Sequence, residues 1–152
     1  QNLQFNTEIL SDSTSLHSLT AQMLHAVPRL HCLRDPTRGG VAGVFNEWAN
    51  PYGLGFVVDE NALPIRDAVR GACELLGIDP LYVANEGKLV AVCAAADADN
   101  LLAAMKAHPQ GRDAAIIGEA IADSHCFVQM KTSFGGKRIV DWLAGDQLPR
   151  IC

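Results

Sequence analysis

The sequence has few charged residues, few aromatic residues and no long apolar run. Only 19% of the 152 residues are charged and 6% are aromatic. No stretch approaches 18 uninterrupted apolar residues, so we expect no transmembrane helix and no membrane partner. Acidic residues outnumber basic ones by 17 to 12. This balance argues against a protein that binds nucleic acid, because such proteins usually carry a clear basic excess.

The cysteines do not follow the spacing of a disulfide framework or a zinc site. There are five, an odd number, and no C-x-x-C occurs. We expect no signal peptide, and the number and spacing of the cysteines then favour a reducing cytoplasm. Two His-Cys pairs, His31-Cys32 and His125-Cys126, lie in stretches that we expect to be strands. Adjacent side chains of a strand point to opposite faces, so each pair offers at most one ligand and we predict no metal site. Cys73 and Cys93 are interpreted as core thiols.

Apolar residues make up 49% of the chain and fall into short helical and extended patterns. We expect helices over about 14–27, with N-caps offered by residues 11–13, and over 41–50, 67–76 and 97–107. Strands are expected over 30–33, 53–59, 82–84, 89–94, 114–121, 125–131 and 137–142. This order predicts an α+β fold over residues 1–143, a mixed sheet with helices packed on it. Residues 144–152 have no periodicity, and we expect a flexible tail that carries Cys152.

The first candidate site is the turn Asp35-Pro36-Thr37-Arg38-Gly39-Gly40, between a predicted strand and a predicted helix. Glycines at a helix entrance let an anion approach the free backbone N–H groups, and Arg38 adds a forked cation that suits phosphate. A tight strand-to-helix turn capped by Thr37 explains the same residues. The pattern of a P-loop is absent.

The second candidate is Glu86 in Asn85-Glu86-Gly87-Lys88, which interrupts an apolar stretch. Burial there would raise the pKa of a carboxyl group and let it act as a base near neutral pH. A solvated turn between two strands is the alternative interpretation.

The third candidate is the last residue, Cys152. Its own carboxylate disfavours the thiolate, which is the reactive form, and Arg150 lies on the same side of an extended tail and offsets that charge. A tail with a nucleophile at its tip suits a group carrier. A frayed chain end without a role is the alternative.

Four segments, in this order, resemble the HypE family: DPTRGGVAGVFNEWA, ALPIRDAVRGACELLG, ANEGKLVAV and the ending LPRIC. HypE proteins are hydrogenase maturation factors that make the cyanide ligands of the [NiFe] active site. The resemblance covers residues 3–152 and the C-terminal half of the family. It implies the C-terminal α+β domain of the aminoimidazole-ribotide synthetase and selenophosphate synthetase superfamily, whose members use ATP to activate an oxygen.

The resemblance also implies a reaction. The carbamoyltransferase HypF loads a carbamoyl group onto Cys152, and the S-carboxamide is dehydrated to a thiocyanate with ATP and Mg. The cyano group then passes to iron on the HypC–HypD complex. Glu86 stands where the family has an acidic residue proposed as the base. Asp35, Arg38, Gly39 and Gly40 match the loop near the nucleotide phosphates.

Family members carry an N-terminal domain that holds most of the ATP site and the homodimer contact, and nothing in these 152 residues resembles it. We therefore expect the chain alone to keep the fold and the cysteine tail, to bind no cofactor and to lack dehydration activity. Two other interpretations stay open. One is another ATP-dependent synthetase of the superfamily, and the other is a non-catalytic docking module or metallochaperone that uses surface thiols.

Overall fold

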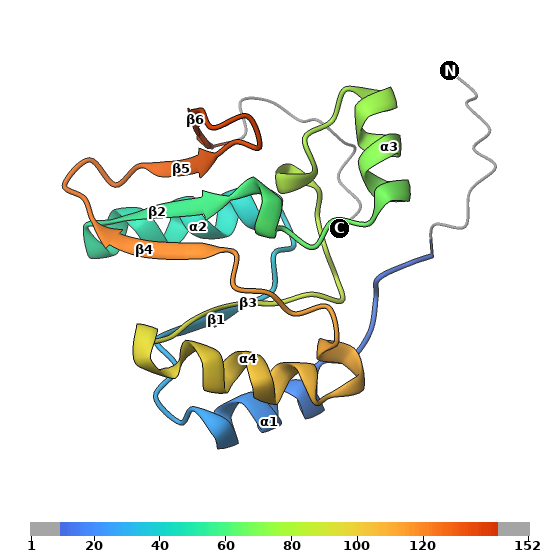
Figure 1. Cartoon of the computed structure of the whole chain (residues 1–152), viewed down its shortest axis with the longest axis vertical. Coiled ribbons are helices and arrows are strands. Elements are labelled where there is room, and N and C mark those ends of the chain that lie inside the picture. Colours follow the sequence, from blue (N-terminus) through green and yellow to red (C-terminus); the bar gives the residue numbers. More distant parts are fainter. Residues whose placement is uncertain (1–9, 143–152) are drawn as a thin grey trace.

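The computed structural model describes residues 10–142 as an α+β fold, as the sequence predicted (Figure 1). The helices are α1 (His17–Ala26), α2 (Gly40–Tyr52), α3 (Asp67–Leu76) and α4 (Ala98–Lys106), and the strands are β1 (Cys32–Arg34), β2 (Leu54–Asp59), β3 (Val90–Val92), β4 (Gly118–Ala122), β5 (Val128–Lys131) and β6 (Lys137–Ile139). Short 3-10 turns include η1 (Glu60–Ala62) and η2 (Pro80–Tyr82). Within the described range, no helix is long and apolar enough to cross a bilayer.

The larger layer is a mixed sheet with the strand order β4-β2-β5-β6. Strand β2 runs parallel to β5 and antiparallel to β4, and β6 runs antiparallel to β5. Helix α2 packs on this sheet through Phe45, whose ring stacks on that of Phe56 in β2 at 4.9 Å between centroids. Val128 and Met130 of β5 complete the same buried cluster. The mixed sheet was therefore predicted correctly.

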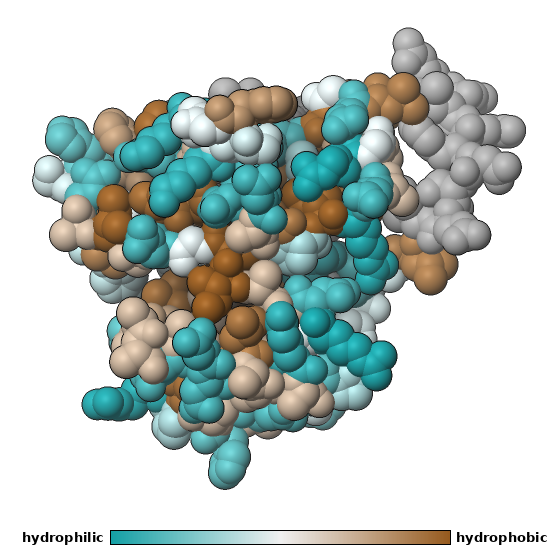
Figure 2. All heavy atoms as spheres, viewed as in Figure 1, coloured by the Kyte–Doolittle hydropathy of each residue, from teal (hydrophilic) through white to brown (hydrophobic). Residues whose placement is uncertain are grey.

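A smaller layer holds the antiparallel pair β1–β3 together with α1 and α4. Leu19 and Met23 of α1 and Leu101 of α4 form its buried core, and Leu33 of β1 packs against them. Figure 2 shows apolar atoms between the two layers and hydrophilic side chains over much of the surface around them. The sequence had predicted one sheet. The described residues form two, because β1 and β3 pair only with each other and cover their own helices.

Several predicted boundaries were wrong for local reasons. Residues 82–84 form no strand, because the Asp79 carboxylate accepts the N–H of Leu81 at 2.9 Å and starts the turn η2 instead. Helix α2 continues through Pro51, and it ends at Gly53, whose left-handed backbone closes the last turn. Helix α1 begins at His17 after Leu16, and no side chain of residues 11–13 caps it.

The pair His125-Cys126 lies in a turn between β4 and β5 rather than in a strand. The Asp123 carboxylate accepts the backbone N–H groups of His125 at 3.0 Å and of Phe127 at 3.2 Å. Cys126 has a φ of 55°, in the left-handed region that non-glycine residues rarely adopt. Local side-chain bonds to the backbone therefore outweigh the extended tendency of this apolar stretch.

Candidate functional site

The turn of residues 35–40 leads from β1 into α2 and is built on two left-handed glycines. Gly39 has a φ of 78° and Gly40 a φ of 61°. The N–H of Gly40 donates to the carbonyl of Thr37 at 3.0 Å, so Thr37 contributes its backbone rather than a side-chain cap. Gly39 is the N-cap residue, and no side chain caps α2. Asp35 and Arg38 are exposed. The helix thus begins with backbone N–H groups that no side-chain cap occupies, which is the arrangement that favours an anion.

The same turn packs tightly against the segment around η2. A Cβ on Gly40 would lie 2.3 Å from the carbonyl oxygen of Leu81 and 2.8 Å from that of Val83. The N–H of Asn85 donates to the carbonyl of Pro36 at 2.9 Å. The two motifs that the sequence singled out separately therefore lie side by side.

Strand register explains why these two loops meet. In the antiparallel pair, Arg34 at the end of β1 lies opposite Val90 at the start of β3. The chain that leaves β1 and the chain that enters β3 therefore emerge at the same end of the pair. An ion pair between Arg34 and Glu47 of α2 ties the smaller layer to the helix that follows the turn.

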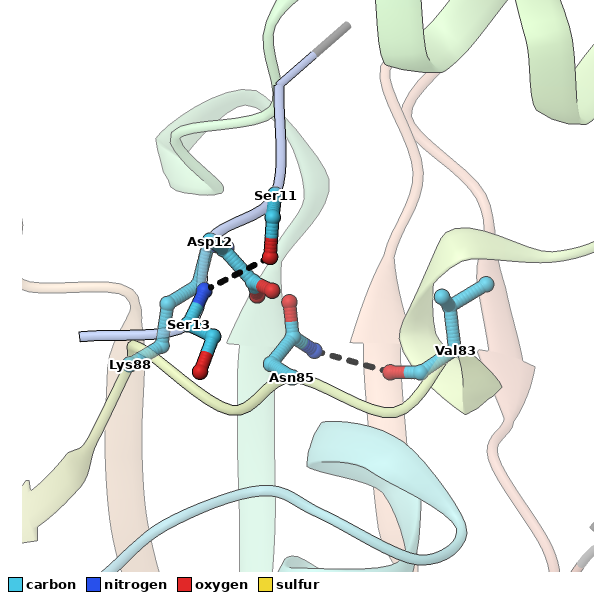
Figure 3. A network of polar contacts seen from close by, with 6 residues as sticks. All are labelled: Ser11, Asp12, Ser13, Val83, Asn85 and Lys88. Atoms are coloured by element: carbon cyan, nitrogen blue, oxygen red, sulfur yellow. Dashed lines mark hydrogen bonds and ion pairs between the residues drawn. The ribbon is translucent and has the colours of Figure 1, made fainter. Parts of the chain in front are cut away.

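Glu86 is exposed in the loop between η2 and β3. The burial on which the sequence argument depended is not found in the structure, and a strand borders the loop on one side only. Asn85 fixes the start of the loop, because its side-chain amide donates to the carbonyl of Val83 at 2.8 Å (Figure 3). Because Glu86 is exposed, its carboxylate is accessible to a substrate.

Sequence reasoning missed the contribution of Asp12, which it treated only as one of three possible N-caps. Its carboxylate forms an ion pair with Lys88 at 2.9 Å, across 76 residues of sequence. Partial burial acts to raise the pKa of Asp12, but the hydrogen bond and charge of Lys88 outweigh it, with backbone hydrogen bonds from Asp12 and Glu86, and the pKa is lowered. In the sequence, the only local indication of this ion pair is Lys88, the one cation of the motif Asn85-Glu86-Gly87-Lys88.

Cys152 and Arg150 lie outside the described residues, as does the predicted tail over 144–152. Among the described thiols, Cys73 is buried and Cys93 is half-buried. Burial raises the pKa of both, and the nearby carboxylates of Asp79 and Asp97 raise it further. Over residues 10–142, no group of three or more His, Cys, Asp or Glu side chains is placed to hold a metal ion.

Comparison with known proteins identifies the family. The model of the AIR synthase related protein, C-terminal domain, matches residues 2–131. The chain belongs to this family. It is 64% identical over its whole length to the carbamoyl dehydratase HypE of Cupriavidus necator and 44% identical to that of Escherichia coli K12. These alignments cover 43% and 44% of the two relatives, so the chain spans less than half of their length.

Solved HypE structures share the fold. A HypE structure in complex with ATP superposes with a TM-score of 0.90 at 40% identity, over 99% of this chain and 46% of that one. A HypE–HypF complex gives 0.87 at 42% identity, over 93% and 46% of the two chains. The resemblance to HypE that the sequence motifs indicated is confirmed.

Proposed function

We propose that this chain is the C-terminal part of a carbamoyl dehydratase of the HypE type. In this reaction, an S-carbamoyl cysteine is dehydrated to a thiocyanate that supplies a cyanide ligand for the iron of a [NiFe] hydrogenase. The 64% identity to the Cupriavidus necator carbamoyl dehydratase over all 152 residues carries the proposal. The adjacency of the two motif loops, through the Asn85 to Pro36 hydrogen bond, supports it.

The turn of residues 35–40 fits the phosphates of a nucleotide. Gly39 and Gly40 leave no side chain over the first turn of α2, and the exposed Arg38 guanidinium can form paired hydrogen bonds with phosphate. The exposed Asp35 carboxylate offers the hard oxygen ligand that Mg²⁺ prefers. ATP supplies the phosphoryl group that turns the amide oxygen into a good leaving group. The structure of a HypE protein in complex with ATP supports ATP as the nucleotide.

The remaining steps belong to residues of this chain. The Cys152 thiolate attacks the carbonyl carbon of the carbamoyl group on its donor in HypF, so that an S–C bond forms while the bond from this carbon to the donor breaks and the donor's leaving group stays with HypF. Arg150 offsets the charge of the neighbouring terminal carboxylate. During dehydration the C–O bond breaks and the oxygen leaves as phosphate. The nitrogen loses two protons: Glu86 accepts one, and the other leaves with the phosphate. Residues 144–152 serve as the carrier segment between the partner that loads the cysteine and the dehydration site.

The partners follow from the same assignment. HypF delivers the carbamoyl group, and the HypE–HypF structure supports this contact. The HypC–HypD complex takes the cyano group, and the homodimer contact belongs to the N-terminal half of the longer proteins. Relatives named as a carbamoyl dehydratase and as a hydrogenase expression/formation protein favour this function over that of other ATP-dependent synthetases and over a metallochaperone.

The test is the intact mass of the chain after incubation with HypF, ATP and carbamoyl phosphate. We expect one carbamoyl adduct, lost in Cys152→Ser and kept in the control Cys126→Ser. A chimera with the N-terminal half of the Cupriavidus necator protein should then lose the mass of one water. The Glu86→Gln chimera should load but dehydrate about 100-fold to 10,000-fold more slowly than the wild-type chimera, and the chain alone should not hydrolyse ATP. An adduct that persists in Cys152→Ser would refute the carrier role.

A further inference from the structure

The segment of residues 11–13 crosses directly over the loop that carries Glu86 (Figure 3). A Cβ on Gly87 would lie 1.5 Å from the carbonyl oxygen of Asp12 and 3.1 Å from a side-chain carbon of Thr14. No rotation of a side chain can relieve a clash with a backbone carbonyl. Position 87 therefore has to be glycine for the two segments to lie this close.

The Asp12 carboxylate lies beside the loop near Gly87. Lys88 donates to it at 2.9 Å, and the nearby backbone N–H of Glu86 helps to lower its pKa. On the other side of Glu86, the N–H of Asn85 donates to the Pro36 carbonyl at 2.9 Å. The backbone of Glu86 is thus held between the segment of Asp12 and the turn proposed to bind phosphate.

We propose that Asp12 is a positioning residue for Glu86, and that Lys88 keeps the Asp12 carboxylate in place. The inference rests on the proposed function, in which Glu86 takes a proton from the substrate nitrogen. Glu86 itself is exposed, so packing of its side chain cannot fix its position. Contacts made by Asn85, Gly87 and Lys88 fix its backbone instead, next to residues 35–40.

The strength of these contacts sets the expected effects. The ion pair is partly solvated, with side-chain exposures of 53% for Lys88 and 35% for Asp12, so Lys88→Met should lower kcat only about twofold to fivefold. Asp12→Ala also removes the carboxylate that lies near the Glu86 N–H. Displacement of the base Glu86 lowers the rate much more than loss of the ion pair does. For Asp12→Ala we therefore expect kcat to fall by about tenfold to hundredfold with an unchanged KM for ATP. Asp12→Asn keeps an acceptor oxygen, so its loss of kcat should lie between those of Lys88→Met and Asp12→Ala.

The first arm of the test uses the 152-residue chain and needs no activity. Hydrogen–deuterium exchange of the peptide over residues 84–88 should accelerate in Asp12→Ala and in Gly87→Ala. The matched controls are Asp113→Ala, an exposed carboxylate, and Gly71→Ala, where an added Cβ meets nothing within 4 Å. Unchanged exchange in Asp12→Ala would overturn the proposal.

The second arm measures dehydration by the chimera described above. If Asp12 acts through Glu86, Asp12→Ala should slow the wild-type chimera but add nothing in the Glu86→Gln background. An equal loss in both backgrounds shows a general structural role and overturns the proposal. An inactive wild-type chimera counts against the proposed function, and the exchange experiment then decides by itself whether Asp12 holds the loop.

Discussion

Gly40→Ala is the sharpest perturbation of the candidate site, because Gly39→Ala is its natural control. Both glycines are left-handed, so alanine at either position costs roughly 1–2 kcal/mol in backbone conformation. The surroundings differ. A Cβ on Gly39 would lie 3.5 Å from the nearest atom, the Cα of Gly43, which is ordinary contact. A Cβ on Gly40 would lie 2.3 Å from the Leu81 carbonyl oxygen, which belongs to the backbone.

Such overpacking costs about 1–3 kcal/mol in addition. We therefore expect Gly39→Ala to lower the free energy of unfolding by roughly 1–2 kcal/mol and Gly40→Ala by about 2–5 kcal/mol. Urea unfolding followed by far-UV circular dichroism measures both on the 152-residue chain. Equal losses in the two variants would refute the close approach between the start of α2 and η2, and with it the argument that this contact fixes the proposed phosphate turn.

Two further predictions concern ionisable groups. Cys73 should react with iodoacetamide at neutral pH more slowly than the half-buried Cys126, because burial excludes the reagent and raises the pKa of Cys73; peptide mapping over time measures the order. The Ser133 N–H donates to the Glu60 carboxylate at 2.7 Å and is the largest cause of its lowered pKa. The ionised Glu60 carboxylate therefore stabilises the folded state above its ordinary pKa of 4.5, and this stabilisation is lost as the pH falls through the lowered pKa. Glu60→Gln should be less stable than the wild type at neutral pH, and the difference should shrink below pH 4.5 in urea unfolding; a difference independent of pH would contradict this.

Local signals in the sequence were sufficient for much of the fold. Helix α3 was predicted at its observed bounds, because an amphipathic pattern ends at Gly77 and this glycine adopts the left-handed C-cap. The turn before β6 has a signal of the same local kind, since Gly135 has a φ of 83° and the Thr132 N–H bonds to the Gly136 carbonyl at 2.8 Å. In both cases the residues that determine the structure are neighbours in sequence.

Features that depend on distant residues were missed. The pairing of β1 with β3 as a separate sheet joins Cys32 to Val92, and each strand alone has no signal for its partner. The contact of Asp12 with Lys88 spans 76 residues, and the burial expected at Glu86 depended on a strand that the Asp79 carboxylate converts into a turn. Motif patterns thus singled out the candidate residues, whereas tertiary contacts determine how the loops that carry them are held.

The geometry of the candidate site depends on contacts at both ends of its two loops. At one end, the register that places Arg34 opposite Val90 makes the loops start from adjacent positions. At the other end, the missing Cβ of Gly40 lets the start of α2 lie against the backbone of residues 81–83. The Asn85 N–H to Pro36 bond then joins the loops between these points. Because every one of these contacts is made by backbone atoms, exposed residues such as Arg38 and Glu86 keep their relative places without being packed themselves. A substrate that binds such a site must order the exposed side chains, at about 0.5–1.5 kcal/mol each, but it need not order the backbone that carries them.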